Sequence, residues 1–166
     1  MIVLIGFMGA GKTTVGGLLA EHLGMPFVDS DEVIEASVGL AVREIFETQG
    51  EAEFRRVEAA TITGLLAGPD VVLALGGGAL TPPEVRAALV DQQVVLLDVA
   101  FGEALERVAA DPGRPMLHTP DLSGLYERRQ DAYREAARVV VQVSGRSPRE
   151  VVADVMGALG MDSVGE

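Results

Sequence analysis

The chain contains no cysteine. This absence excludes a disulfide scaffold, a thiolate metal site and a cysteine nucleophile, and it fits a reducing compartment. Long hydrophobic runs are also missing, because no apolar stretch approaches the roughly 18 residues of a membrane span. The first apolar segment begins at Met1, which leaves no room for a signal or transit peptide. We therefore expect a cytoplasmic protein with no membrane partner.

Basic residues are scarce as well. The 166 residues include 13 Lys and Arg against 25 Asp and Glu, which gives a formal net charge of −12. Such a charge repels nucleic acid and anionic membranes, so neither is an expected partner. With 48% hydrophobic residues the chain can bury a substantial core. We expect a single domain over residues 1–166 that acts as a monomer on a small-molecule substrate.

Lysine occurs once, at Lys12, against twelve arginines. It lies in the stretch 6–14, Gly-Phe-Met-Gly-Ala-Gly-Lys-Thr-Thr, which fits the phosphate-binding pattern G-x-x-x-x-G-K-[ST]. The presence of the one lysine of the chain at this position indicates that a compact ammonium is required where the planar guanidinium would not fit. The pattern predicts that a nucleotide binds here.

The surroundings of this stretch are those that the pattern requires. Residues 1–5 form an apolar run typical of a buried parallel strand, and residues 13–23 carry apolar side chains at helical spacing. Glycines let successive backbone N–H groups point inward, and the helix N-terminus adds a positive dipole. A polyphosphate anion is the expected ligand.

The rest of the chain alternates strands and helices. We expect strands over 1–5, 26–28, 71–75, 94–99 and 139–143, and helices over 13–23, 32–37, 42–48, 51–66, 83–90, 101–110, 125–137 and 148–159. This α/β alternation predicts one parallel sheet covered on both faces, with ligands at the carboxyl ends of its strands. Residues 31–67 would form a helical insertion, and residues 111–123, rich in Pro, Gly and Asp, would form a lid loop.

Asp29 and Asp31 follow the second strand. In extended chain their carboxylates would point to the same side, toward the phosphate loop. One could hold a water of a Mg²⁺ shell near Thr13, and the other could orient an acceptor hydroxyl and take its proton. The alternative is a helix-capping aspartate beside a surface one. Asp98, at the end of an apolar strand, is a second candidate for the magnesium carboxylate.

Three further features have both functional and ordinary interpretations. Arg55 and Glu58 share one helical face, where the carboxylate could steer the guanidinium or form a plain surface pair. The three glycines at 76–78 could form a tight turn or leave backbone amides open to a ligand. Arg114 could close over the γ-phosphate as part of the lid, or be a solvated loop residue.

Taken together, the motifs resemble the shikimate kinase family in order and spacing. The resemblance rests on Gly-Phe-Met-Gly-Ala-Gly-Lys-Thr-Thr at 6–14, Asp-Ser-Asp at 29–31, Gly-Glu-Ala-Glu-Phe-Arg-Arg-Val-Glu at 50–58, Gly-Gly-Gly-Ala at 76–79 and Arg-Pro-Met-Leu at 114–117. It implies the P-loop fold of the nucleoside monophosphate kinases, with a five-stranded parallel sheet. It also implies ATP-dependent phosphorylation of the 3-hydroxyl of shikimate, in the pathway to chorismate and the aromatic amino acids.

The resemblance also implies a role for individual residues. Catalytic roles fall to Lys12, Asp31 and Arg114. ATP would be held by Gly9, Ala10, Gly11, Lys12, Thr13, Thr14, Arg107 and Arg146, the two arginines in the adenine pocket. Shikimate would be held by Asp31, Arg55, Gly76, Gly77, Gly78 and Arg129, with Arg55 and Arg129 on its carboxylate. Mg²⁺ would be held by Thr13 and, through its water shell, Asp29.

Other classes of nucleotide-binding protein fit less well. A gluconate-type or other small-metabolite kinase would share the loop and the lid but differ in the acceptor pocket. A GTPase needs an Asn-Lys-x-Asp motif, which a chain with lysine only at position 12 cannot contain. An ATP-driven mechanical protein would carry a glutamate after Asp98, where Val99 stands.

Overall fold

Five parallel strands form one sheet in the order β2-β3-β1-β4-β5. The structure is a computed structural model that describes residues 1–109 and 120–161. The strands are β1 (Ile2–Ile5), β2 (Phe27–Asp29), β3 (Val72–Ala74), β4 (Gln93–Asp98) and β5 (Val139–Gln142). In register, Leu4 of β1 lies between Ala74 of β3 and Val95 of β4. Because all pairs are parallel, the carboxyl ends of the strands share one edge of the sheet, as the alternating pattern predicted.

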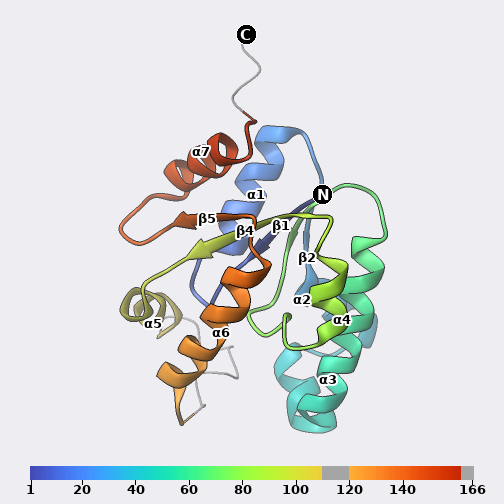
Figure 1. The fold of residues 1–166 in the computed structure, drawn as a ribbon. Coiled ribbons are helices and arrows are strands. Elements are labelled where there is room, and N and C mark those ends of the chain that lie inside the picture. The colour runs from blue at the N-terminus through green and yellow to red at the C-terminus, as the bar shows by residue number, and fades with distance from the viewer. Residues whose placement is uncertain (110–119, 162–166) are drawn as a thin grey trace.

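Helices flank this sheet (Figure 1). They are α1 (Lys12–Leu23), α2 (Ser30–Val38), α3 (Val42–Leu66), α4 (Pro83–Ala88), α5 (Phe101–Ala109), α6 (Leu122–Ala136) and α7 (Pro148–Ala158). In Figure 1, α1 and α7 pack together near the top, whereas α2 and α3 pack against each other at the lower right. The α/β class and the five-stranded parallel sheet are confirmed. Within the described residues, no helix is both long enough and apolar enough to cross a membrane.

Burial explains why the strand sequences are almost wholly apolar. The central strands β1, β3 and β4 are buried along nearly their whole length, so polar side chains are excluded from both faces. Helix α1 packs closely on the sheet at Gly16, where an added Cβ would lie 2.4 Å from the ring of Phe27. The unit of α2 and α3 has its own small core of Ile34, Ile45 and Phe54.

Two element boundaries matter for the site. Helix α3 consists of two helical segments joined at a kink at Gly50, whose φ of 84° and ψ of 166° are not helical. This kink lies between the two helices expected over 42–48 and 51–66. Helix α6 begins at Leu122 instead of residue 125, because the carboxylate of Asp121 accepts a hydrogen bond of 2.8 Å from the backbone N–H of Gly124. Residues 122 and 123 are therefore helical, not part of a lid loop.

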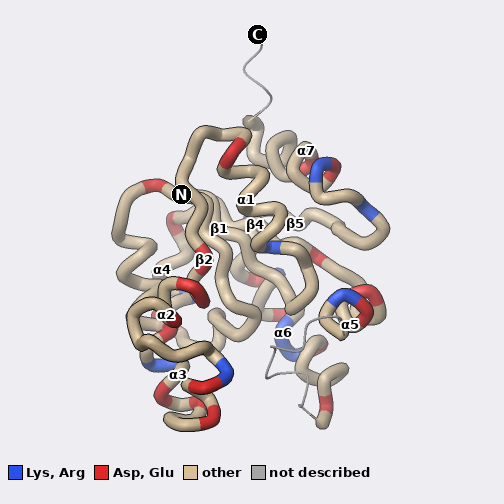
Figure 2. The backbone as a smooth tube through the Cα atoms, turned by 180° about the vertical axis from the view of Figure 1, so that it is seen from behind, with Lys and Arg blue, Asp and Glu red and all other residues tan. Residues whose placement is uncertain are grey.

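Most arginines of the outer surface pair with nearby carboxylates. Figure 2 shows basic segments interspersed with acidic ones along α3, α5 and α7. On α3, Arg43 pairs with Glu47 at 2.7 Å, and Arg56 pairs with Glu53 at 2.6 Å. All four side chains are well exposed, so each pair contributes little to stability, roughly 0–1 kcal/mol. Arg55 and Arg129, described next, are less exposed than these surface arginines.

Candidate active site

The loop between β1 and α1 lies at the carboxyl edge of the sheet. Gly9 and Gly11 have φ values of 79° and 86°, a left-handed conformation that favours glycine. Lys12 opens α1, and its ammonium donates hydrogen bonds to the carbonyl oxygens of Gly6 at 2.7 Å and Phe7 at 3.1 Å. The loop thus places a cation beside the N-terminus of a helix. This combination binds polyphosphates.

A cleft of about 680 Å³ opens over this loop. The size is that of a pocket for a small ligand or nucleotide. Its walls come from the loop, the start of α2, the end of β3, α5 and the turn before α7. The lining residues are 9–15, Asp29, Asp31, Glu32, Glu35, Val42, Leu75, Gly76, Gly77, Arg107, Val143, Arg146, Pro148 and Val151.

Asp29 joins the loop to helix α2. Its Oδ2 accepts a hydrogen bond of 2.9 Å from the hydroxyl of Thr13, and its Oδ1 accepts one of 3.0 Å from the backbone N–H of Asp31. The second bond makes Asp29 the N-cap of α2. The expected extended geometry is therefore wrong, because the helix begins at Ser30, directly after the strand. Both carboxylates still line the cleft, while Ser30 is buried and accepts a hydrogen bond from the N–H of Gly76.

The carboxyl group of Asp31 is a weaker acid than an ordinary aspartate. Burial and neighbouring negative charge raise its pKa from 3.8 to about 6. Burial is the largest cause. The charged neighbours are Asp29, Glu58 and Glu35, which raise the pKa, and Lys12, which lowers it. A carboxylate with a pKa near 6 is mostly ionised at neutral pH and remains basic enough to take a proton from a bound hydroxyl.

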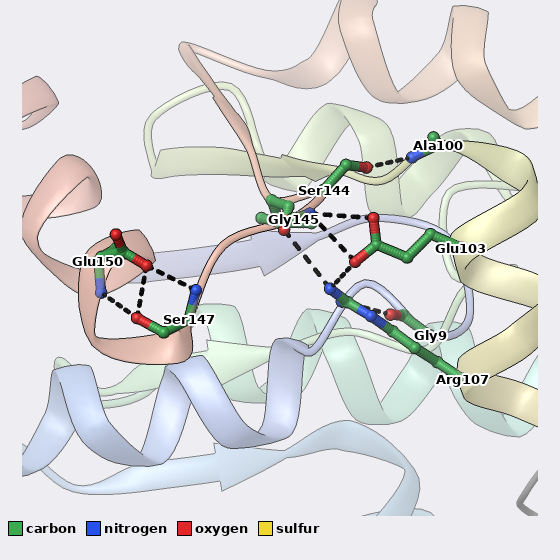
Figure 3. Close-up of polar contacts among 9 residues, drawn as sticks. Gly9, Ala100, Glu103, Arg107, Ser144, Gly145, Ser147 and Glu150 are labelled. Carbon is green, nitrogen blue, oxygen red and sulfur yellow. Dashed lines mark hydrogen bonds and ion pairs between the residues drawn. The ribbon is translucent and has the colours of Figure 1, made fainter.

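Arg107 forms one wall of the cleft on the α5 side (Figure 3). Its guanidinium donates a hydrogen bond of 3.0 Å to the carbonyl oxygen of Gly9 in the phosphate loop, and it forms an ion pair with Glu103 one turn earlier. The Glu103 carboxylate also accepts a hydrogen bond of 3.1 Å from the N–H of Gly145. Glu103 thus holds together α5 and the turn after β5, while Arg107 contacts the loop.

The turn after β5 leads directly into α7. Ser147 and Glu150 form a capping box, in which the Glu150 carboxylate accepts from the N–H of Ser147 at 2.8 Å (Figure 3). This fixes the chain on either side of the cap, where Arg146 and Pro148 line the cleft. Arg146 pairs with Asp154 on α7. An apolar ring and two guanidiniums therefore surround one end of the cleft, a setting that suits a flat aromatic base.

A second pocket of about 100 Å³ adjoins the cleft. The two share Asp31, Val42, Gly76 and Gly77. The lining residues of the second pocket are Met8, Asp31, Val42, Phe46, Phe54, Arg55, Glu58, Gly76, Gly77, Gly78 and Arg129. It therefore combines two carboxylates of raised pKa, those of Asp31 and Glu58, with two arginines from different helices.

Arg55 is held in this pocket by Glu58. Its guanidinium lies 2.5 Å from the Glu58 carboxylate, whose side chain is only 1% exposed. Burial raises the pKa of Glu58, and the charge of Arg55 opposes that shift. The glycine turn leaves room for the guanidinium, because a Cβ on Gly78 would lie 2.2 Å from one of its nitrogens. The pair therefore lies in the wall of the pocket, with Glu58 buried and Arg55 only 14% exposed, and is not an ordinary surface pair.

Arg129 reaches the same pocket from α6. Its guanidinium carbon lies 5.9 Å from the ring centre of Phe7 in the phosphate loop. Burial lowers its pKa, and the nearby charge of Arg55 lowers it further. Two partly buried guanidiniums that repel each other favour the binding of an anion, because a carboxylate between them relieves the repulsion and accepts their hydrogen bonds.

Sequence comparison identifies the group of proteins to which this site belongs. The protein-family model described as Shikimate kinase matches residues 8–159. A curated shikimate kinase from Mycobacterium tuberculosis (strain ATCC 25177 / H37Ra) is 40% identical over 168 residues, covering 99% of this chain and 96% of that protein. The chain belongs to the shikimate kinase family.

Solved structures agree with this membership. A shikimate kinase from Acinetobacter baumannii, in complex with shikimate, superposes with a TM-score of 0.92 at 36% identity, covering 99% of this chain and 94% of that one. A gluconokinase from Sinorhizobium meliloti reaches a TM-score of 0.60 at 22% identity, covering 96% and 90%. The second likeness reflects the fold alone.

Every described residue that the shikimate kinase resemblance implied lines one of the two pockets. One candidate that was singled out apart from that resemblance does not. Asp98, the second candidate for the magnesium carboxylate, accepts a hydrogen bond of 2.8 Å from the side chain of Gln142, and it lies outside the lining of both pockets. Arg114 lies outside the described residues, as do residues 111–119 of the lid loop expected over 111–123.

Sequence reasoning missed several residues of the site. Phe46 and Phe54 form an aromatic wall under Arg55, whose guanidinium carbon lies 5.9 and 5.2 Å from their ring centres. Glu103 was not singled out, although its spacing of four from Arg107 is that of a helical ion pair. Tyr133 stands four residues after Arg129, and the same spacing would have paired these two.

Proposed function

We propose that this protein transfers the γ-phosphoryl group of ATP to the 3-hydroxyl of shikimate, giving shikimate 3-phosphate and ADP. The observation that carries this proposal is the meeting of Arg55, Arg129 and Asp31 in one small pocket beside the phosphate loop. An acceptor with a carboxylate and hydroxyl groups matches that set of side chains. Family membership and the likeness to a shikimate-bound shikimate kinase support the choice.

The donor would occupy the larger cleft. The backbone amides of residues 9–14 and the ammonium of Lys12 would bind the β- and γ-phosphates, so Lys12 would exchange its carbonyl contacts for phosphate oxygens. Arg107 and Arg146 would enclose the adenine at the other end, with Pro148 as an apolar surface. Arg114 is expected to close over the phosphates from the lid.

The acceptor would occupy the smaller pocket. Arg55 and Arg129 would bind its carboxylate, and this places its ring against the glycine turn of residues 76–78. Asp31 would then accept a hydrogen bond from the reacting hydroxyl and take its proton as the new bond to phosphorus forms. The electron pair of the broken bond leaves on the β-phosphate oxygen of ADP, beside the loop amides and Lys12.

A magnesium ion fits the oxygens at the start of α1. Thr13 and Asp29 place a hydroxyl and a carboxylate oxygen 2.9 Å apart at the edge of the cleft, and magnesium takes few protein ligands together with waters and phosphate oxygens. No group of three or more His, Cys, Asp or Glu side chains within the described residues forms a metal cage. Thr13 would contact the ion and Asp29 its water shell. The ion would neutralise charge on the phosphates.

We further propose a domain organisation and cellular setting for this activity. Residues 1–166 would act as one kinase domain, with residues 31–67 forming the substrate-binding insertion and residues from about 111 to 121 the lid. The enzyme would work as a monomer in the cytoplasm, without nucleic acid or membrane partners. Size-exclusion chromatography with light scattering would test the oligomeric state, and a dimer at micromolar concentration would contradict it.

The direct test is an assay of ADP release with a panel of acceptors. We expect rapid turnover with shikimate and far slower turnover with quinate, gluconate and nucleoside monophosphates. Quinate shares the carboxylate, so it tests the hydroxyl geometry, whereas gluconate tests the alternative small-metabolite kinase. Preference for gluconate would replace the proposed function by that alternative.

A further inference from the structure

A buried tyrosine joins two walls of the acceptor pocket. Tyr133 lies on α6, one helical turn after Arg129, and only 1% of its surface is exposed. Its hydroxyl donates a hydrogen bond to the carbonyl oxygen of Gly77 in the glycine turn. The same hydroxyl interacts with the guanidinium of Arg129. One oxygen therefore contacts both the turn that lines the pocket and an arginine proposed to bind the acceptor carboxylate.

The Tyr133 hydroxyl and the Arg129 guanidinium both lie close to Gly77. A Cβ built on Gly77 would lie 3.2 Å from Nη1 of Arg129 and 3.6 Å from the Tyr133 hydroxyl. Within the described residues, the other interactions of Arg129 are less directional. The guanidinium carbon of Arg129 lies 5.9 Å from the centre of the Phe7 ring, a contact with little directional preference. The Glu58 carboxylate attracts the guanidinium through its charge. The phenol is thus the group that ties the guanidinium to the glycine turn.

We propose that Tyr133 is a positioning residue that sets Arg129 against the glycine turn and so determines the preference of this enzyme for a carboxylate-bearing acceptor. The inference rests on the proposed function. Tyr133 does not line the pocket, so it acts through Arg129 and Gly77 and not by touching the acceptor. A phenol suits the task because one O–H can accept from a guanidinium and donate to a carbonyl at once.

The other tyrosine of the chain provides a matched control. Tyr126 lies on the same helix, and its hydroxyl also donates to a backbone carbonyl, that of Val99, at 2.7 Å. Its ring packs against the rings of Phe7 and Phe101. Replacing it by phenylalanine keeps those ring contacts and removes one hydrogen bond outside both pockets. Tyr126→Phe and Tyr133→Phe therefore make the same chemical change at two places on one helix.

The experiment compares wild type, Tyr133→Phe and Tyr126→Phe with two acceptors, shikimate and an analogue whose carboxylate is replaced by a neutral hydroxymethyl group. We expect Tyr133→Phe to raise KM for shikimate about tenfold while KM for ATP changes less than about twofold. In Tyr133→Phe, the ratio of kcat/KM for shikimate to kcat/KM for the analogue should fall by a similar factor. Tyr126→Phe should leave that ratio unchanged. A partly unfolded sample slows both acceptors equally, so the ratio isolates positioning from stability.

The outcomes separate this inference from the function on which it rests. If wild type phosphorylates shikimate and Tyr133→Phe keeps the wild-type ratio, the positioning role is refuted while the function stands, even if the variant melts at a lower temperature. An equal fall in the ratio for both phenylalanine variants also refutes it, because the effect would then not be specific to Tyr133. If wild type shows no turnover with shikimate, the proposed function fails first and takes this inference with it.

Discussion

The hydroxyl of Thr13 and the carboxylate of Asp29 are joined by a hydrogen bond of 2.9 Å that connects the first turn of α1 to the N-cap of α2. We expect Asp29→Asn to raise the Mg²⁺ concentration needed for half-maximal activity several-fold, because an amide attracts the water shell of a cation less than a carboxylate does. The measurement is a Mg²⁺ titration of initial rates at saturating ATP and acceptor.

Asp91→Asn provides the control for that titration, because it removes an exposed carboxylate just before β4, at the opposite edge of the sheet. The asparagine at position 29 can still cap α2, so the fold should persist. An unchanged Mg²⁺ requirement in Asp29→Asn would exclude Asp29 from the metal site.

Substitution of Lys12 is the second test. A single lysine among so many arginines predicts that phosphoryl transfer needs the shape of this side chain as well as its charge. Lys12→Met should leave the fold intact and abolish phosphoryl transfer, since it removes the point charge next to the leaving oxygen. Lys12→Arg should also lose most activity, because the loop contacts at Gly6 and Phe7 suit a compact ammonium. Single-turnover rates would check this. Near-wild-type turnover in the arginine variant would show that charge alone is sufficient.

Asp31 predicts a pH dependence. Only its ionised form can accept a proton, and its pKa lies at about 6, so kcat/KM should rise with pH through about 6 and level off above it. Asp31→Asn should lower kcat by roughly a hundredfold or more and remove this limb, with little change in ATP affinity. A pH profile of kcat/KM for both proteins is the measurement. Rescue of Asp31→Asn by excess Mg²⁺ would instead assign the metal role to Asp31.

The same aspartate predicts a stability effect. Its pKa is higher in the folded state than the ordinary 3.8, so the folded state binds the proton more tightly, and the ionised carboxylate destabilises the fold as pH rises through about 6. Asp31→Asn should therefore be more stable than wild type at pH 8, by up to about 3 kcal/mol. The gain should shrink by roughly half at pH 5. Urea denaturation at both pH values tests this, and a gain independent of pH would contradict it.

The phosphate loop could be predicted from the sequence because its information is local. An apolar run, a glycine loop with one lysine and a helical pattern are contiguous, and each limits the backbone conformation of its own segment. The geometry of Asp29 and Asp31 was not predictable in the same way. Whether the chain stays extended or begins a helix after β2 depends on which residue caps it, and here Asp29 itself does so.

The acceptor pocket depends on contacts between distant segments. Nothing in the spacing of Arg55 and Arg129 brings their side chains to one pocket, and only the family resemblance paired them. Asp98 is the opposite case, because its strand fits a magnesium-binding pattern in the sequence although the residue lies outside both pockets. The register of β4 and β5 sets Asp98 opposite Gln142, whose side-chain amide donates a hydrogen bond to the Asp98 carboxylate. Tyr133 was missed because a tyrosine in a helix usually belongs to the core, and its hydroxyl partner is far along the chain.

The central claim is that two arginines bind the carboxylate of the acceptor. Arg56→Ala and Arg128→Ala are controls, because each changes the arginine adjacent in sequence to Arg55 or Arg129, and both of these neighbours are exposed and pair with surface carboxylates. A charge-assisted contact contributes about 1.5 to 3 kcal/mol, so Arg55→Ala and Arg129→Ala should each weaken acceptor affinity roughly ten- to a hundredfold. ATP affinity should hold.

The most direct measurement is the ratio of kcat/KM for shikimate over its neutral hydroxymethyl analogue in wild type and these four variants. Because it is a ratio, it does not depend on how much of a sample is folded, which matters where loss of Arg55 leaves Glu58 buried without its partner. We expect wild type and both control variants to prefer the acid strongly, and Arg55→Ala and Arg129→Ala to lose most of that preference. Full preference for the acid in both pocket variants would contradict the account.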